Sequence, residues 1–304
     1  MILFAEQLLN GLQYGALLFM LASGLTLIFG IMGVINLTHG AFYMVGAYCA
    51  AFSLLGTGSY AVAVVAALVG AGLYAALVEL AVVQWLYRRD HLYQVLATLG
   101  LILFTNEAVS MIFGRRPPLM DVPAVLQGAV HLAPGLDYPV ARLAFIAVGA
   151  LVALGLWMLV NHTRLGMLIR AGADDREMVD ALGVDIRRLY TVVFALGGLL
   201  CGLAGVVAAP LLAVEIGMGE RILITTFVVI VIGGVGSVRG ALAGALLVGM
   251  VDSLGRAYLP QLLQSALPGP MSDTLGAGLV SASIYILMAA VLLVRPLGLF
   301  PARA

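Results

Sequence analysis

Few side chains in this sequence are arranged for catalysis. None of His39, His91, His131 and His162 belongs to an HExxH zinc motif, and no serine is the centre of a GxSxG nucleophile motif. The 15 basic residues are all arginine, so the chain lacks the lysine with which a P-loop binds nucleotide phosphates. We therefore expect no catalytic residue, no metal site and no cofactor in this chain, and any energy from a nucleotide must come from another protein.

Charge is concentrated in one polar segment, residues 163–188, which we call the polar island. It holds ten of the 30 charged residues and lies between two apolar stretches long enough to cross a bilayer. Its centre, residues 173–182, is predicted to form a short helix. Asp174 and Asp175 begin this helix, where acids are favourable, and Gly183 can end it.

The predicted island helix carries a small apolar face made of Met178, Ala181 and Leu182. One interpretation is a helix that lies on the lipid surface, which the neighbouring arginines would favour. Four acids in the same stretch weigh against anionic lipid. We therefore favour a protein partner in water.

Two glycine-rich breaks interrupt apolar sequence and are candidates for a transport path, because discontinuous helices often mark such paths. The first break contains Asn36, His39 and Gly40, and the second contains Gly233, Gly234 and Gly236. Both contain a GxxG followed by a polar residue and Gly-Ala, which is compatible with an internal repeat. Asn36 and His39 would lie near the path if they are buried in the membrane. A loop at the membrane interface, where they cost nothing, is the alternative.

The composition shows which elements position these residues. The 304 residues are 63% hydrophobic and 10% charged, with a mean hydropathy of +1.12, whereas a soluble domain has about 25% charged residues. The sequence therefore predicts an all-α polytopic membrane bundle, one domain over residues 1–304, with eight or nine transmembrane segments. Long spans are predicted at 10–31, 60–86, 93–113, 140–160, 189–212, 240–258 and 276–294, and the shorter segments 38–55 and 222–235 are full spans or half-helices.

The arginines predict the orientation, since cytoplasmic loops hold the excess of basic residues. Alternate assignment of the loops places ten arginines on the side of the polar island and five on the other, so the island is expected in the cytoplasm. Nine crossings would place the N-terminus outside, and eight would place it inside. The external side then has a proline-rich loop, 114–139, and a second loop near 260–273, each a docking surface or a plain connector.

Isolated acids and cysteines inside the spans point to no further chemistry. Glu79, Glu107 and Asp252 each lie within about two turns of a predicted span end, so snorkelling or end-capping explains them as well as a proton relay would. Cys49 and Cys201 both lie in apolar runs and are interpreted as small buried hydrophobes. The net charge of zero argues against a nucleic-acid partner.

Four ordered motifs carry a family resemblance. They are GLTLIFGIMGVINLTHGAFYMVGAY, RAGADDREMVDALGVDIRRLY with FALGGLLCGLAGVVAAP after it, TTFVVIVIGGVGSVRGALAGALLVGMVD, and LLVRPLGLFPARA. From about residue 8 to 301 the chain resembles the permease subunits of bacterial ABC importers for branched-chain amino acids. It is most similar to the first permease of the leucine/isoleucine/valine system, with urea and amide permeases as relatives.

The resemblance implies a multi-pass protein of the bacterial inner membrane, surrounded by lipid. It also implies three kinds of partner: a second related permease, two ABC ATPases that bind ATP and Mg²⁺, and an external substrate-binding protein. The polar island then corresponds to the coupling loop that sits in a groove of the ATPase. Arg170, Ala171, Asp174, Asp175, Ala181 and Gly183 match the coupling motif, and Glu177 is included in the predicted coupling set.

The resemblance leaves the cargo open. Asn36, His39 and Gly40 match the family signature after the first span, but Ala41 stands where many relatives have glutamate. The expected cargo is a branched-chain or related small amino acid that moves inward, with urea or short amides as the alternative. The rival classes are a stand-alone ion-coupled carrier or channel and a membrane scaffold.

Overall fold

The computed structural model describes residues 2–34, 36–87, 89–266 and 270–301. Within these ranges the chain is almost entirely helical. The first half contains α1 (Ile2–Met32), α2 (His39–Thr57), α3 (Tyr60–Ala81), α4 (His91–Phe113), α5 (Val140–His162), α6 (Arg164–Asp174) and α7 (Arg176–Ala181). The second half contains α8 (Ile186–Ala208), α9 (Met218–Gly233), α10 (Val238–Ala266) and α11 (Pro270–Val294). Short 3₁₀ turns, Val83–Trp85 and Ala124–Leu126, and two strands, β1 (Ala129–Ala133) and β2 (Leu136–Pro139), complete the described elements.

The predicted membrane bundle is confirmed. Seven helices of the described chain are long and apolar enough to cross a bilayer, and all nine predicted apolar segments form helices. α9 has only 16 residues, about 24 Å of helix, which is shorter than the roughly 30 Å of hydrocarbon. The shorter segments predicted from the sequence are thus present, and α9 is a short helix rather than a full span.

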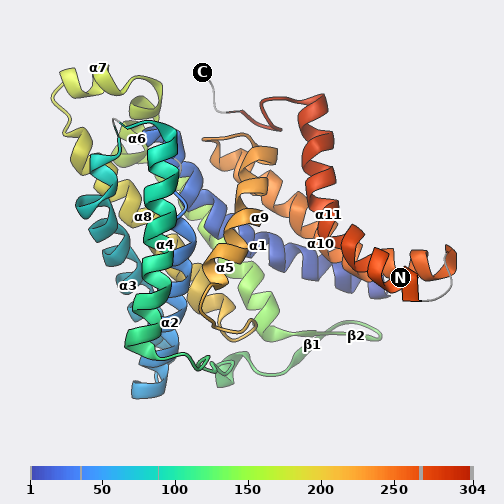
Figure 1. Ribbon diagram of the computed structural model, residues 1–304. Coiled ribbons are helices and arrows are strands. Elements are labelled where there is room, and N and C mark those ends of the chain that lie inside the picture. Colours follow the sequence, from blue (N-terminus) through green and yellow to red (C-terminus); the bar gives the residue numbers. More distant parts are fainter. Residues whose placement is uncertain (1, 35, 88, 267–269, 302–304) are drawn as a thin grey trace.

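The helices form a bundle with two distinct ends. Figure 1 shows α6 and α7 at one end, together with the C-terminal segment, and the β1–β2 hairpin at the opposite end. We call these ends the island side and the hairpin side. α2, α3, α4 and α8 pack together. α1 runs obliquely across the bundle with α10 beside it, and α11 packs against α10 and α9 (Figure 1).

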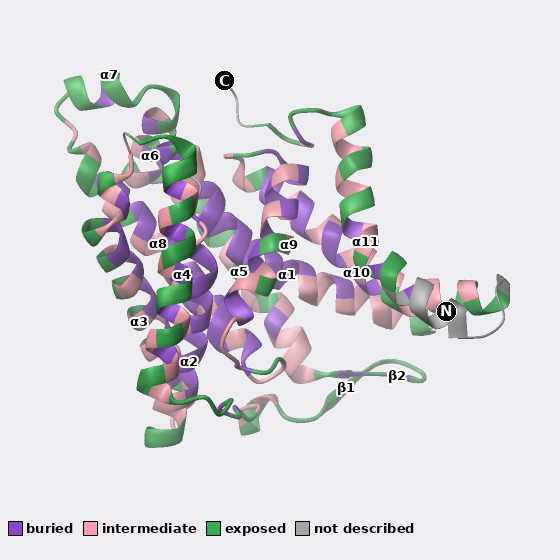
Figure 2. Cartoon of the chain, in the orientation of Figure 1, coloured by how far each residue is buried: buried purple, intermediate pink, exposed green. Residues whose placement is uncertain are grey.

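The core of the bundle lies along α1. In the most apolar part of each helix, 89% of α1 is buried within the protein, against 22% for α4 and 17% for α5. Figure 2 shows the same contrast, because the exposed residues gather on the outer helices. The exposed side chains of α4 and α5 are mostly apolar, as expected for helices that face lipid.

Small residues allow the helices to approach closely. A Cβ added at Gly198 would lie 2.5 Å from the Cβ of Ala75, and one added at Gly202 would lie 2.5 Å from the carbonyl oxygen of Ala67, so α8 and α3 are in backbone contact. Gly11 and Gly15 of α1 meet α10 in the same way. Within each pair the two glycines are four residues apart, and this GxxxG spacing marks close helix packing in this protein.

The hairpin side differs from the sequence prediction at one loop. The proline-rich loop 114–139 is irregular apart from one 3₁₀ turn and the β1–β2 hairpin. Pro260, however, lies inside α10 rather than in a loop. A membrane helix tolerates an internal proline where neighbouring structure satisfies the freed backbone groups. Residues 267–269 of that predicted loop lie outside the described residues.

The structure also corrects the prediction for Glu79, which neither snorkels to the membrane surface nor caps a helix end. The residue is buried, and its carboxylate accepts hydrogen bonds from Tyr87 Oη at 2.5 Å and from Thr191 Oγ1 at 2.7 Å. Burial, together with the hydrogen bond to Glu79, raises the pKa of Tyr87, so the hydroxyl stays a donor at neutral pH. These bonds join α3, the connection to α4, and α8.

Candidate functional site

The polar island begins with α6, which folds back against the end of α5. Thr163 caps the helix, because its Oγ1 accepts a hydrogen bond from the Gly166 N–H at 3.1 Å. A Cβ at Gly166 would lie 2.6 Å from the carbonyl carbon of Val160, so only a glycine fits there without displacing the backbone. The Arg170 guanidinium donates to the carbonyl oxygen of Val160. This arrangement fixes α6 on the island side of the bundle.

The centre of the island is two helices, not the single helix predicted from the sequence. Asp174 is the last residue of α6 instead of the first residue of a new helix. Asp175 has an extended backbone and caps α7, with Oδ1 accepting from the Met178 N–H at 2.9 Å. Gly183 follows α7 with a φ of +86°, which glycine adopts without strain. The start at Asp175 and the stop at Gly183 therefore agree with the prediction.

The apolar face predicted on the island helix points into solvent. Met178 is 58% exposed and Leu182 is 76% exposed, and Ala181 and Glu177 are exposed beside them. Figure 2 shows α7 as an exposed projection at the edge of the molecule. A small apolar patch rimmed by charge is the usual form of a protein-docking surface.

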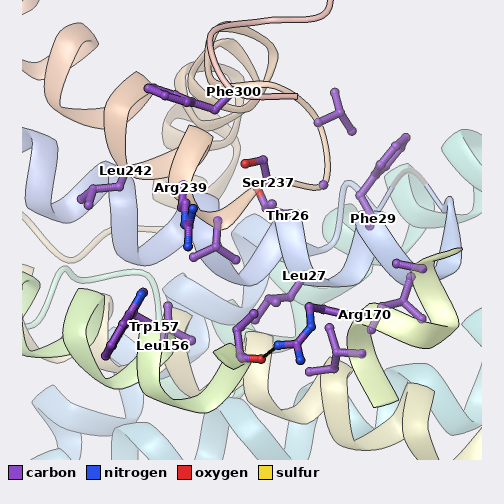
Figure 3. Close-up of a pocket in the computed structure, with 18 of the residues that line it drawn as sticks. Thr26, Leu27, Phe29, Leu156, Trp157, Arg170, Ser237, Arg239, Leu242 and Phe300 are labelled. Carbon is purple, nitrogen blue, oxygen red and sulfur yellow. Dashed lines mark hydrogen bonds between the residues drawn. The ribbon is translucent and has the colours of Figure 1, made fainter. Parts of the chain in front are cut away.

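The inner side of the island lines a large cavity of about 1250 Å³. Its walls come from the end of α1, the end of α5, α6, the start of α10 and the C-terminal segment. Figure 3 shows Arg170 from α6, Trp157 from α5 and Arg239 from α10 around this space. Of the predicted coupling residues, Arg170, Ala171 and Asp174 line the cavity. The other predicted coupling residues, Asp175, Glu177, Ala181 and Gly183, lie on α7 or its flanks.

The second glycine-rich break forms one edge of the same cavity. Gly233 ends α9, Gly234 and Gly236 form the turn to α10, and Gly236 lines the cavity. A Cβ at Gly30, near the end of α1, would lie 3.2 Å from the Cα of Gly236, so α1 meets the break directly. The structure thus places Gly236 and three of the predicted coupling residues around one space.

The polar residues of the first break lie elsewhere, inside the bundle. Asn36 is 0% exposed and His39 is 1% exposed, so neither is in a surface loop. His39 Nε2 lies 3.0 Å from the carbonyl oxygen of Leu21 and 3.1 Å from the Sγ of Cys201. Asn36 Oδ1 accepts from the Thr38 N–H at 3.0 Å. His39 therefore joins the start of α2 to α1 and α8, whereas the hydrogen bond of Asn36 is local; neither side chain lines the large cavity.

Gly40, the third residue of the first break, is a point of contact between two helices. A Cβ at Gly40 would lie 2.7 Å from the carbonyl carbon of Gly219 at the start of α9. The start of α9 therefore lies alongside the N-terminal end of α2. From Gly40 the helix continues for 17 residues, or about 25 Å, to its last residue, Thr57.

The sequence interpretation missed the role of the C-terminal segment. The Leu299 N–H donates to the carbonyl oxygen of Ile232, and the Phe300 N–H donates to that of Gly233, both at 2.9 Å. These bonds satisfy carbonyl groups that the end of α9 would otherwise leave without partners. Phe300 also lines the large cavity. The Pro-Leu-Gly sequence before Leu299 was a signal for a turn, but no local pattern names its partner.

Comparison with known proteins identifies relatives along most of the chain. A family model described as "Branched-chain amino acid transport system / permease component" matches residues 7–294. The high-affinity branched-chain amino acid transport system permease protein LivH of Escherichia coli (strain K12) is 28% identical, over 84% of this chain and 87% of that protein. The high-affinity branched-chain amino acid transport system permease protein BraD of Pseudomonas aeruginosa is 26% identical, over 97% of this chain and 95% of that protein. The probable permease LivH of Methanocaldococcus jannaschii is 27% identical over 94% and 89%. No solved structure matches the chain significantly.

Proposed function

Since the chain belongs to the family of permease components of branched-chain amino acid transport systems, we propose that it is the membrane-spanning permease subunit of an ATP-driven importer. Its cargo is a branched-chain or related small aliphatic amino acid. The partners are two ATPases on the island side, a second related permease, and a substrate-binding protein on the hairpin side. The island side then faces the cytoplasm, in agreement with the arginine distribution.

The observation that carries this proposal is the two-sided position of the polar island. Its outer part, α7, presents Met178 and Leu182 to solvent, and its inner part, α6, lines the 1250 Å³ cavity with Arg170 and Asp174. A force applied to α7 therefore reaches the cavity through only the single extended residue Asp175. A loop that merely connects two spans needs neither the outer patch nor the inner contacts.

The geometry suggests how ATP hydrolysis drives transport. Closure of the ATPases displaces α7, and α6 moves with it because Asp175 N–H is hydrogen-bonded to the Ala171 carbonyl oxygen at 2.9 Å. Movement of α6 changes the cavity wall opposite Gly236, where α9 turns into α10. The path then opens alternately to the two sides as these helices shift.

Charge reversal on α7 tests the coupling assignment. We expect Glu177→Arg to weaken retention of the ATPase by at least about tenfold, because like charges at an interface cost several kcal/mol. The variant should still insert in the membrane, since Glu177 is exposed and outside every span. Co-purification of the ATPase with the tagged permease measures the effect.

Two matched variants complete that experiment. Glu177→Gln removes the charge without reversing it and should have a smaller effect than Glu177→Arg. Asp137→Arg reverses an exposed acid on the hairpin side and should leave ATPase retention unchanged. Full retention of the ATPase by Glu177→Arg would contradict the coupling assignment.

The rival functions predict different behaviour in vesicles. A stand-alone carrier or channel would transport solute in vesicles that contain this chain alone, without nucleotide. We expect no transport under these conditions, and ATP-dependent uptake only when the ATPases and the partner permease are present. An assembly scaffold would transport nothing with any partner.

A further inference from the structure

A second cavity, of about 320 Å³, lies where α1, α2, the loop after α8 and the start of α9 meet. It shares no lining residue with the large cavity. α9 runs between the two, since its start lines the smaller cavity and its last residue, Gly233, lies on the island side. The smaller cavity is therefore on the part of α9 nearer the hairpin side, where the external solution is expected.

The smaller cavity contains one acid and one base. Glu215, in the loop before α9, forms an ion pair with Arg221 in the first turns of α9. Glu215 is held in a turn, because its carbonyl oxygen accepts from the Met218 N–H at 3.2 Å. Tyr14 from α1 and Tyr43 from α2 also line the cavity. A second pair nearby, Asp252 with Arg256 on α10, does not line the cavity.

The rest of the lining is apolar. Leu212, Met218 and Ile222 lie around the charged pair. The volume is at the small end of the range of about 300–1000 Å³ that ligand pockets span. A small ligand with two opposite charges and an aliphatic side chain matches these walls, because each of its parts meets a complementary group.

We propose that this cavity is a transit site for a zwitterionic aliphatic amino acid, with Arg221 binding its carboxylate and Glu215 binding its ammonium group. The inference rests on the proposed function and assigns a site to it. In the empty site the two side chains neutralise each other. A zwitterion can replace this ion pair with two ion pairs of its own, whereas urea or a short amide offers neither side chain an opposite charge.

The position of the site relative to α9 supports its role in transport. The N-terminus of α9 carries the positive end of the helix dipole, which favours a carboxylate near Arg221. The same N-terminus touches Gly40 of α2 through Gly219, one residue after Met218. A ligand between Glu215 and Arg221 thus lies beside the contact of α2 with α9, and the far end of α9 leads to Gly236 in the large cavity.

The test uses the complete transporter in proteoliposomes, with a photoreactive diazirine analogue of leucine as the probe. In the wild type we expect photolabel on residues 212–222, and competition by leucine but not by urea. Glu215→Gln and Arg221→Gln should each reduce this label and ATP-driven leucine uptake by at least about tenfold. Arg256→Gln is the matched control, because Arg256 is as exposed as Arg221 and is also ion-paired but lies outside the cavity, and it should stay within about twofold of the wild type.

The outcomes separate the site from the function. If the wild type takes up leucine, but Glu215→Gln and Arg221→Gln do so equally well or the label lies elsewhere, the site is wrong and the importer function stands. If the wild-type complex takes up urea and not leucine, the proposed cargo is wrong, and the zwitterion site falls with it. Basal ATP hydrolysis in every variant reports whether the complex has assembled.

Discussion

The contact between Gly40 of α2 and Gly219 of α9 allows a quantitative prediction. A Cβ at Gly40 would lie 2.7 Å from the carbonyl carbon of Gly219, and a Cβ at Gly219 would lie 2.5 Å from that of Gly40. The obstructing atoms are backbone, so no side chain can rotate away. The helices would have to part by at least about 0.7 Å to raise the first distance to the 3.4 Å of ordinary contact.

Overpacking of this kind costs about 1–3 kcal/mol. We expect Gly40→Ala and Gly219→Ala each to lower the free energy of unfolding by about 2 kcal/mol, which is roughly a 30-fold change in the unfolding equilibrium. One separation of the helices accommodates both methyl groups. The double variant should therefore cost less than the sum of the single variants, by at least about 0.5 kcal/mol.

Unfolding of the purified chain in mixed micelles, with increasing denaturing detergent, measures these free energies. Gly100→Ala in α4 is the matched control, because no atom lies within 4 Å of its added Cβ. Its effect should be neutral or stabilising by up to about 1 kcal/mol. If Gly40→Ala is as stable as Gly100→Ala, or if the double variant shows the full sum, the packing argument is refuted.

Two further predictions concern the island side. Glu79→Gln should lower the free energy of unfolding by about 1–2 kcal/mol and Glu79→Ala by about 3 kcal/mol. Alanine removes the acceptor of the Tyr87 hydroxyl and leaves the Thr191 hydroxyl only the carbonyl oxygen of Arg187. Equal effects of the two substitutions in the same micelle assay would contradict this explanation. Gly183→Ala should destabilise the end of α7 by about 1 kcal/mol, because of the left-handed backbone at Gly183, and Gly183→Asn should cost less. Faster amide hydrogen exchange over residues 176–182 measures the second effect, and unchanged exchange in Gly183→Ala would count against it.

The sequence predicted the features that local chemistry determines. The apolar segments were found because lipid requires long apolar helices, and the start of α7 at Asp175 and its end near Gly183 follow from capping chemistry. The split of the island at Asp174 was missed, because α6 is extended by tertiary contacts of Gly166 and Arg170 with α5. The helix propensities of the island residues do not predict these contacts.

The candidate site was harder to predict, because its parts come from distant segments. Glu79 accepts a hydrogen bond from Thr191, which is 112 residues away in the sequence. Gly236, Arg170 and Phe300 line one cavity although they belong to three separate motifs. Arg221 was counted only among the five arginines expected outside, and Glu215 was not singled out, because nothing local shows that they line one cavity. The resemblance to a family supplied roles for motifs, but not these juxtapositions.

The oblique course of α1 links this protein to the thickness of its membrane. Its 31 residues make about 46 Å of helix, whereas the hydrocarbon of a typical bilayer is about 30 Å thick. Inclination accommodates the excess length, and a thinner or thicker bilayer favours a different inclination. Because α1 is the buried centre of the bundle and its end meets Gly236, such a change would be felt at the large cavity. The acyl-chain length of the surrounding lipid therefore acts on the inclination of α1 and on the large cavity, and it can be varied without altering a single residue.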